Sequence, residues 1–503
     1  MFENIALGFS TIATFPAMLA ITSGVVIGIL CGVLPGLSAS TAVALMVPFT
    51  FGMDPVVSVL LLVSVYLAGE YGGSITAIAI GTPGTPAAAA TMIDGYQFTK
   101  RGEPGLALTT SVVASSVGGV IGALVLFAFS EPLAEVALSF GAPEYFAMAV
   151  FGLTIIASLA SDNLTKGFIV MFLGLFLKSI GLDPFTGEER LTFGIPKLMD
   201  GISFIPALIG LFAMTSVFTG IEKAMVTTKS VKLSFKMPKI KRLLGMWKVY
   251  LHSSLVGSVI GVLPGAGATI ASFICYNEVK RFSHKKEQFG KGCLEGVAAP
   301  ESGNNAVVGG SLVPLLTLGI PGSATAAVLI GALMLHDIQP GPLLFQTNGE
   351  IVYGIFAGLI VACIVQLVVG LLGVPVWVKV ISAPKALLLP VIAAISVVGS
   401  YGYNNSMVDV WVMFCFGLLG YLLKKFKFPV TPIILALVLG GILEENFRRS
   451  LMMSDGDLTI FVSQPISATL LIMAVLSLAS PIFFNKLAKK DQTIEESTET
   501  KAV

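Results

Sequence analysis

The sequence predicts an all-α polytopic membrane protein with two inverted-topology repeats, re-entrant hairpins and Pro/Gly-broken helices. Three observations lead to this fold class. The 503 residues are 55% hydrophobic and only 12% charged, whereas a soluble domain has about 25% charged residues. The segment 105–130 carries no charge and exceeds the ~20 residues that a spanning helix needs. Gly/Pro-rich motifs also recur in the same order in both halves. We expect roughly 10–12 membrane segments.

Two motifs establish the duplication. The segment GVLPG occurs at 32–36 and again at 261–265, an offset of 229 residues. Gly81-Thr82-Pro83-Gly84 is answered by 319–322, with an offset of 238. We pair Glu70 with Glu301 as a third match, at an offset of 231. Matched, broken and polar-decorated membrane segments in two halves are typical of a secondary transporter's binding site.

The placement of Lys and Arg predicts that the two copies are inverted. Residues 1–99 contain neither, and Lys100 and Arg101 follow the first copy. The second GVLPG has basic segments on both sides, and residues 292–378 again lack Lys and Arg. Because basic loops stay in the cytoplasm, this exchange of sides is what an inverted repeat produces. The predicted divisions are repeat 1 (1–221), a basic cytoplasmic connector (222–247), repeat 2 with additional C-terminal helices (248–485) and a disordered cytoplasmic tail (486–503).

Taken in order, residues 16–33 and 38–51 flank the first GVLPG, and 55–68 leads to Glu70 and the 81–86 break. Uncharged runs then predict further spans near 105–130, 143–160, 167–182 and 202–220. The stretch between Glu222 and Tyr250, which includes the connector, carries eight basic residues from Lys223 to Lys248. It is either a cytoplasmic loop that obeys the positive-inside rule or a binding patch for anionic lipid or a partner. Later spans are expected near 351–373, 384–400, 407–423, 430–443 and 460–484.

The Pro-Gly breaks predict the substrate site. Proline and glycine end one half-helix and start another within the bilayer. The new N-terminus presents unpaired N–H groups and a partial positive charge, which suit a carboxylate. The alternative is a pair of kinked packing helices. The candidate substrate-binding residues are Pro35, Gly36, Ser38, Ser40, Thr41, Gly81, Thr82, Pro83, Gly84, Pro264, Gly265, Gly267, Thr269, Pro321, Gly322 and Ser323.

The two glutamates predict a cation-coupling site. A carboxylate at membrane depth is costly unless it is paired, protonated or metal-bound. Unwound backbone carbonyls, hydroxyls and amides beside it would suit Na⁺, and a desolvated Glu could instead carry a proton. Alternatively, each glutamate caps a helix near the interface. Asp94 and Asp337 are interpreted as loop residues at helix exits. The candidate cation-coupling residues are Glu70, Gly72, Gly73, Ser74, Glu301, Ser302, Asn304 and Asn305.

Other functional classes find little support in the sequence. The five cysteines show no metal spacing, the three histidines make a His-rich metal site improbable, and a net charge of +1 gives no indication of nucleic acid binding. No phosphate loop, HExxH or GxSxG motif is present, so we expect neither an enzyme nor a cofactor. No basic region precedes the first apolar stretch, so we expect no removable signal peptide.

These blocks resemble a known family. The order GVLPGLSAST, EYGGSITAIAIGTPGTPAAAATMIDGY, GVLPGAGATIASF and PESGNNAVVGGSLVPLLTLGIPGSATAAVL is similar to the large membrane subunit of the tripartite tricarboxylate transporters, the TctA type. The resemblance implies a bacterial inner-membrane carrier that imports an organic acid such as citrate with Na⁺ or H⁺. It also implies two partners, a small membrane subunit and a periplasmic solute-binding protein.

Three rival functions stay open at this point. A self-sufficient carrier or channel would need no binding protein. A membrane enzyme acting on a lipid-linked substrate would need an acid or nucleophile pair. A purely structural scaffold would leave the duplicated polar breaks without a purpose.

Overall fold

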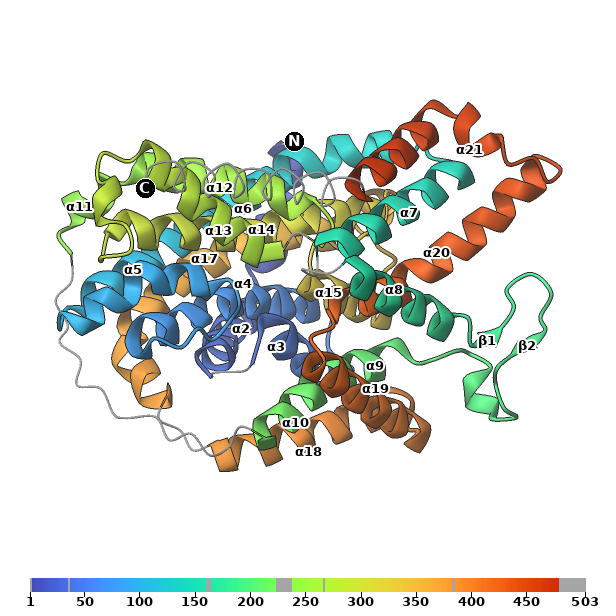
Figure 1. Ribbon diagram of the computed structural model, residues 1–503, viewed down its shortest axis with the longest axis horizontal. Helices are drawn as coiled ribbons and strands as arrows, with labels where there is room; N and C mark the ends of the chain where they lie inside the picture. The colour runs from blue at the N-terminus through green and yellow to red at the C-terminus, as the bar shows by residue number, and fades with distance from the viewer. Residues whose placement is uncertain are drawn as a thin grey trace, which may run out of the picture. The chain divides into compact units, whose positions relative to one another are not determined.

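The computed structural model describes residues 2–34, 37–159, 164–222, 238–265, 267–381 and 385–478. These residues are almost entirely helical, which confirms the predicted all-α polytopic class (Figure 1). Six helices in this described part are long and apolar enough to cross a membrane: 15–33, 55–80, 104–137, 204–222, 349–373 and 407–425. Shorter apolar helices accompany them at 39–50, 142–155, 324–335 and 465–478.

The chain divides into two compact units. The larger unit contains residues 1–139 and 194–427, and the smaller one contains 140–193 and 428–503. These units differ from the repeat boundaries expected above, which stay a prediction. The expected C-terminal tail, residues 486–503, lies outside the described residues. The helices of the larger unit are α1 (Phe2–Ile12), α2 (Phe15–Val33), α3 (Ala39–Met46), η1 (Val47–Thr50), α4 (Pro55–Ile80), α5 (Ala88–Lys100), α6 (Pro104–Ala137), η2 (Pro196–Leu198), α9 (Phe204–Ile209), η3 (Gly210–Met214), α10 (Thr215–Glu222), α11 (Ile240–Leu244), α12 (Trp247–Val262), α13 (Gly267–Phe282), η4 (Lys286–Gln288), α14 (Leu294–Leu318), α15 (Ala324–Leu335), α16 (Leu344–Thr347), α17 (Gly349–Ile381), α18 (Lys385–Asn404) and α19 (Met407–Lys425).

The smaller unit is held together on one side by an ion-pair network. Asp183 accepts hydrogen bonds from the backbone N–H groups of Phe185 and Thr186 and pairs with Arg190 and Arg448 at 2.6 and 2.8 Å. The N–H groups, followed by the two guanidinium groups, hold the pKa of Asp183 well below its usual range. The elements of this unit are α7 (Ala142–Leu159), α8 (Leu164–Lys178), the paired strands β1 (Gly181–Leu182) and β2 (Glu189–Arg190), α20 (Thr431–Met453), α21 (Ile460–Ser463) and the helix 465–478.

The backbone repeats where the sequence motifs repeat. α2 ends at Leu34 with φ −84° and ψ 112°, and α12 ends at Leu263 with φ −78° and ψ 119°. α4 ends at Gly81 with φ 67°, and α14 ends at Gly319 with φ 71°. Both glycines adopt the left-handed conformation that disfavours other residues. The repeat therefore pairs α2 with α12, α3 with α13, α4 with α14 and α5 with α15.

In each repeat a glycine allows the helix that leads into the Leu-Pro-Gly motif to pack directly on the long helix that follows, α2 on α4 and α12 on α14. A Cβ added at Gly32 of α2 would lie 2.5 Å from the carbonyl oxygen of Gly69 in α4. A Cβ added at Gly261 of α12 would lie 2.8 Å from the carbonyl oxygen of Val307 in α14. Both distances are far below van der Waals contact, so only glycine permits these backbones to meet. Figure 1 shows α2, α3 and α4 side by side.

The two repeats run in opposite directions. Tyr66, early in α4, hydrogen-bonds to Ser311, late in α14, whereas Ser74, later in α4, donates to Glu301, early in α14. The equivalent helices α4 and α14 are therefore antiparallel. This is the relation that the exchanged Lys and Arg flanks predicted.

After each long helix the chain folds back into the middle of the bundle. The N–H of Gly84 donates to the carbonyl of Gly73 at 3.1 Å, and Thr99 donates to the carbonyl of Ile78 at 2.6 Å. Residues 81–87 thus return to the level of Gly73, and α5 then runs back to the end of α4. A Cβ added at Gly322 would likewise lie 2.7 Å from Cα of Ser311. α5 and α15 are re-entrant half-helices whose N-termini lie beside the middle of α4 and α14.

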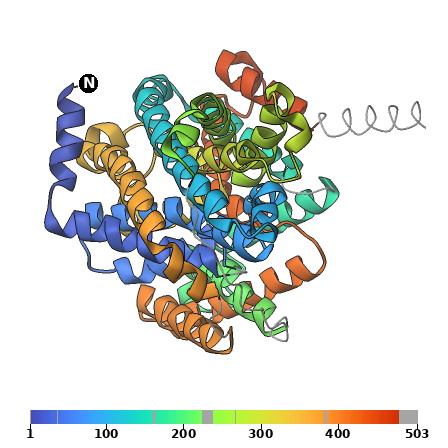
Figure 2. The ribbon, with the colours of Figure 1, turned by 90° about the vertical axis from the view of Figure 1, so that its left-hand side faces the viewer.

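The N-terminal helix α1 packs against α17 at the edge of the larger unit. Figure 2 shows α1 alongside α17, where Asn4 donates to the Tyr353 hydroxyl at 2.8 Å. Helices occupy the expected later spans as α17, α18, α19 and α20, and the expected early ones as α6, α7, α8 and the continuous α9–α10 helix. Of these, α6, α9–α10, α17 and α19 are long and apolar enough to cross a membrane. The expected span 460–484 is divided between α21 and the helix 465–478, and residues 479–484 lie outside the described residues. Most of the basic connector, residues 223–237, lies outside the described residues.

The pairing of Glu70 with Glu301 is wrong. Glu70 lies 11 residues before Gly81, and Glu301 lies 18 residues before Gly319. α4 and α14 are both uninterrupted between these points, so the true offset throughout is 238 and Glu70 corresponds to Val308. The seven-residue difference is roughly two helical turns, about 10 Å along the axis. The expected unwound backbone around these glutamates is also wrong, because the breaks occur only at Gly81 and Gly319.

Candidate functional site

Two half-helix N-termini, one from each repeat, meet inside the larger unit. Ser38 caps α3 by accepting from the N–H of Thr41 at 3.2 Å, and Ser323 caps α15 by accepting from the N–H of Ala326 at 3.1 Å. The hydroxyls of Ser40 and Thr325 hydrogen-bond to each other at 2.8 Å. The partial positive charges of two helix ends therefore fall close together without a basic side chain.

Tyr66 connects this meeting point to the long helices. Its hydroxyl lies 2.8 Å from the Ser323 hydroxyl and 3.1 Å from that of Ser311. The side chain is fully buried, and both of its hydrogen-bonding partners among the described residues come from the second repeat. α4 of the first repeat is thereby joined to the break and to the long helix of the second.

The other predicted substrate residues divide into three groups. Gly84, Pro264, Pro321 and Gly322 are buried at the breaks, where Gly265 donates its N–H to the carbonyl of Gly322 at 3.1 Å. Gly81 ends α4, Thr82 is exposed, and Pro83 and Thr269 are half-buried. Pro35 and Gly36 lie outside the described residues. The second Leu-Pro-Gly break packs on the 319–322 break of its own repeat, and the half-helix tips of the two repeats meet where α3 contacts α15. Gly267 begins α13 with φ 60°.

Glu301 lies in a cage of four hydroxyl groups. Its Oε1 accepts from Ser74 and from Thr91, the latter at 2.5 Å. Its Oε2 accepts from Ser111 at 3.0 Å and Ser115 at 2.7 Å. The residue is 0% exposed, and no Lys or Arg among the described residues pairs with it. Four neutral donors fill the acceptor positions of one buried carboxylate, while the hydroxyl lone pairs stay available to a cation.

Glu70 lies between the cage and the half-helix tips. Tyr66, Glu70 and Ser74 follow one another at i, i+4 and i+8, so they share one face of α4. This face meets α14, where Asn304 donates to the Glu70 carbonyl at 3.3 Å. The eight residues from Tyr66 to Ser74 span about 12 Å. Glu70 retains 8% exposure, in contrast to fully buried Glu301.

The amides beside Glu301 have unused hydrogen-bonding capacity. Both polar atoms of Asn305 and the Oδ1 of Asn304 are buried without a partner among the described residues. A buried polar atom without a partner is destabilising, and native proteins rarely keep one without a function or a water. The predicted residues Gly72, Gly73 and Ser302 contact neighbouring helices and loops: Gly72 meets the Gly32 backbone, Gly73 meets Thr85, and Ser302 donates to the Ala114 carbonyl.

Sequence reasoning missed three members of the cage. Thr91 lies in α5, and Ser111 and Ser115 lie in α6 within the uncharged run that we interpreted only as a span. The i, i+4 spacing of the two serines was a usable signal, because it places both hydroxyls on one helix face. Nothing in the sequence indicated that this face meets Glu301 of the other repeat.

Asp94 is a second correction. It is fully buried within α5 rather than in a loop at a helix exit. Its carboxylate accepts from the backbone N–H groups of Gly290, Gly292 and Cys293 at 2.8–3.1 Å and from the Tyr276 hydroxyl at 2.8 Å. The position that repeats Asp94 in α15 is Ala332, so this clasp has no counterpart there. Asp337, in contrast, lies exposed just after α15, as expected.

Comparisons with known proteins agree with this architecture. Residues 18–435 match the model of the tripartite tricarboxylate transporter TctA family. The chain is 37% identical over 500 residues to the "uncharacterized 52.8 kDa protein in TAR-I ttuC' 3'region" of Agrobacterium vitis, covering 99% of each chain. It is 38% identical over 240 residues to the "uncharacterized protein in TAR-II ttuC' 3'region" of the same organism, which covers 48% of this chain and 99% of that one. No solved structure matches.

Members of this family are large membrane subunits of tripartite transporters, which agrees with a multi-pass helical chain that has paired broken helices. The matched range contains most of α2, all of α3–α6 and α12–α15, and with them the half-helix tips and the Glu301 cage. This chain belongs to the tripartite tricarboxylate transporter TctA family.

Proposed function

We propose that this chain imports tricarboxylates or related organic acids across the bacterial inner membrane by symport with Na⁺ or H⁺. The observation that carries the proposal is the contact of the α3 and α15 N-termini at Ser40 and Thr325. One face of α4 connects this contact, through Tyr66, with the caged Glu301, through Ser74. Such helix ends are anion sites that need no basic residue at membrane depth.

The anion and the cation would occupy neighbouring sites on α4. Substrate carboxylates would bind at the capped tips, where backbone N–H groups and the Ser and Thr hydroxyls are donors. The cation would bind at Glu301, whose four hydroxyl neighbours supply the oxygen ligands that a hard cation prefers. Glu70, about midway between the two sites, would sense the occupancy of both through electrostatics.

Inverted repeats supply a route to alternating access. Two packings related by exchange of the repeats would open the same central site to opposite faces of the membrane. The half-helix α5 would move with its own long helix α4, on which it packs, whereas α15 lies mainly against α3 and α4 of the first repeat. We further propose that a small membrane subunit and a periplasmic binding protein complete the transporter, as the family name implies.

Uptake into proteoliposomes tests this function. The chain, with its candidate small subunit, is given radiolabelled di- and tricarboxylates under an imposed Na⁺ or H⁺ gradient, with and without the binding protein. Accumulation only when gradient and binding protein are both present supports the proposal and names the coupling ion. Uptake without the binding protein would instead favour a self-sufficient carrier, and no uptake under any gradient would contradict the proposal.

A further inference from the structure

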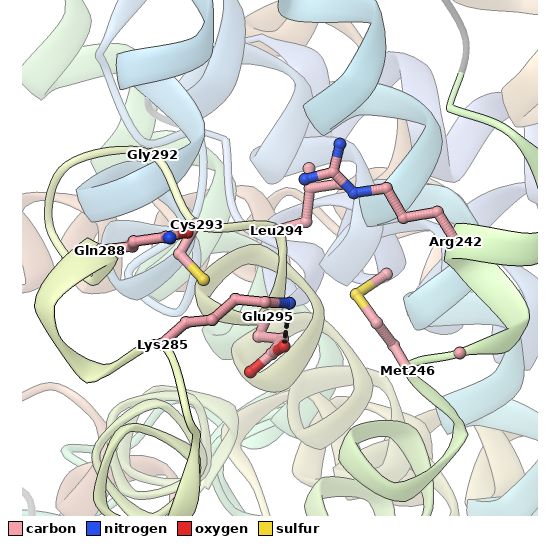
Figure 3. A pocket seen from close by; sticks show the side chains of 9 residues that line it. Arg242, Met246, Lys285, Gln288, Gly292, Cys293, Leu294 and Glu295 are labelled. Carbon is pink, nitrogen blue, oxygen red and sulfur yellow. Dashed lines mark hydrogen bonds and ion pairs between the residues drawn. The ribbon is translucent and has the colours of Figure 1, made fainter.

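A pocket of about 250 Å³ lies outside the transport site, where the α11–α12 junction meets the loop before α14. Water occupies about 30 Å³ per molecule in the liquid, so the pocket has room for a phosphate group and its bound waters. Figure 3 shows Arg242 on one side of it and Lys285 with Gln288 on the other. The wall between them is formed by Gly292, Cys293, Leu294 and Glu295.

The charges in this pocket are unbalanced. Lys285 is paired with Glu295 at 2.7 Å, and Glu295 also accepts from Ser283. Arg242 is exposed and has no acidic partner within ion-pair distance in the described parts of the chain. The N–H groups of Gly292 and Cys293 are already used by Asp94. A ligand would therefore be held by the Arg242 guanidinium and the Gln288 amide, which favour an oxyanion.

An exposed apolar stripe begins at the pocket. It follows α12 at intervals of four residues, a row that winds gradually around the helix, and its members are 41–66% exposed. Ile240 and Leu244 of α11, on either side of Arg242 in sequence, are also exposed. A soluble anion would need the cation but not the stripe. The stripe consists of Trp247, Leu251, Leu255, Val259 and Leu263.

The side of the membrane agrees with a lipid ligand. The pocket is surrounded in sequence by Lys239, Lys241, Lys248 and Lys291, and such basic segments face the cytoplasm. The cytoplasmic leaflet carries anionic lipids, which attract basic segments close to the surface. The positive-inside rule alone explains why several Lys and Arg residues lie in these segments. It does not account for an unpaired Arg in a pocket at the head of an apolar stripe.

We propose that this pocket binds the phosphodiester headgroup of an anionic phospholipid, whose acyl chain lies along the exposed face of α12. Arg242 and Gln288 bind the phosphate oxygens, and Trp247 lies at the level where headgroup and acyl chain meet. The lipid would also contact the 292–295 wall, so its binding stabilises the loop that Asp94 holds. This site is independent of the organic-acid site.

Native mass spectrometry of the purified chain tests the proposal. Phosphatidylglycerol and phosphatidylcholine with the same acyl chains are titrated separately onto wild-type protein, Arg242→Gln and Lys286→Gln. The lysine variant is the matched control, because it removes one exposed cation from the neighbouring open surface formed with Asn277, Lys280 and Arg281. Glycerol phosphate is added as a competitor to distinguish a lipid headgroup from a soluble anion.

We expect one phosphatidylglycerol to bind saturably and more tightly than phosphatidylcholine. Arg242→Gln should weaken its binding at least about tenfold, the effect of losing one charge-assisted hydrogen bond, and Lys286→Gln less than about twofold. Arg242→Lys, which keeps the positive charge, should retain most of the binding. It keeps the test informative if Arg242→Gln proves too unstable to measure. The proposal is overturned if both neutral variants weaken binding equally, if the two lipids bind alike, or if glycerol phosphate competes as well as the lipid.

Discussion

Ser115 offers the sharpest test of the Glu301 cage. Its hydroxyl donates to Glu301 Oε2 at 2.7 Å and leaves Ser111 as the other donor to that atom. A hydrogen bond to a charged group contributes about 1.5–3 kcal/mol, and a factor of ten corresponds to about 1.4 kcal/mol. We therefore expect Ser115→Ala to change the apparent affinity for the coupling cation by roughly tenfold to a hundredfold.

The direction of the change identifies the ion. If Na⁺ is bound by the hydroxyl oxygen, the half-saturating Na⁺ concentration for uptake rises. If a proton is carried, removal of a donor to the carboxylate favours the protonated form, and the pH profile of uptake moves to higher pH by about one to two units. Initial rates of labelled organic-acid uptake into proteoliposomes, measured against Na⁺ concentration and against pH, distinguish the two cases.

Ser116→Ala is the matched control. Ser116 is the next residue on α6 and is also buried, but its hydroxyl has no partner among the described residues. The two variants remove the same atom at similar burial, but only Ser115→Ala removes a hydrogen bond to Glu301. Equal shifts for both variants, or unchanged cation dependence in Ser115→Ala, would refute the role of the cage.

Three further changes test the surrounding structure. Asp94→Asn should loosen the 290–293 loop, because an amide side chain cannot accept all four hydrogen bonds that Asp94 accepts. In a chain whose other cysteines are replaced, maleimide should then label Cys293 about tenfold faster, and an unchanged rate would disprove the clasp. Gly32→Val should abolish correctly folded protein in detergent, whereas Gly349→Ala, with its nearest neighbour 3.7 Å from the new Cβ, should not; normal yield of the valine variant would contradict the packing. Asp183→Asn should lower the thermal midpoint of unfolding at pH 7, an effect that disappears at acid pH.

The sign for Asp183 follows from its lowered pKa. Its folded-state pKa is below the ordinary value of about 3.9, so the charged form stabilises the fold at every pH above that value. This stability is lost as the pH falls below about 3.9 toward the lowered pKa. Wild type and variant should therefore differ most near neutrality and converge in acid. A constant difference across the pH range would point to packing rather than charge.

Local sequence motifs predicted the broken helices well because their cause is local. Gly81 and Gly319 end helices through their own backbone conformation, and the Leu34 and Leu263 ends precede proline. The inversion was also predictable, since Lys and Arg placement reflects the membrane side of each loop. These features depend on a residue and its immediate neighbours along the chain.

The site itself was less predictable because it is assembled across the repeats. Two glutamates with Gly/Ser neighbours looked equivalent, but a continuous helix fixes their register, and Glu301 lies two turns from the place that repeats Glu70. The hydroxyls of Thr91 and Ser115 are ordinary in sequence and become hydrogen-bond donors to Glu301 only through contact with α14. Tertiary contacts of this kind carry no periodic signal.

Gradient-driven accumulation by Glu301→Gln measures the central claim most directly. Wild-type protein, reconstituted with its partners, should concentrate labelled organic acid inside vesicles above the outside level only while the cation gradient lasts. Glu301→Gln, inserted at the same level, keeps the side-chain shape but removes the charge that would bind the cation, and it should show no accumulation. Accumulation by this variant equal to that of wild type would contradict the assignment of Glu301 as the coupling residue.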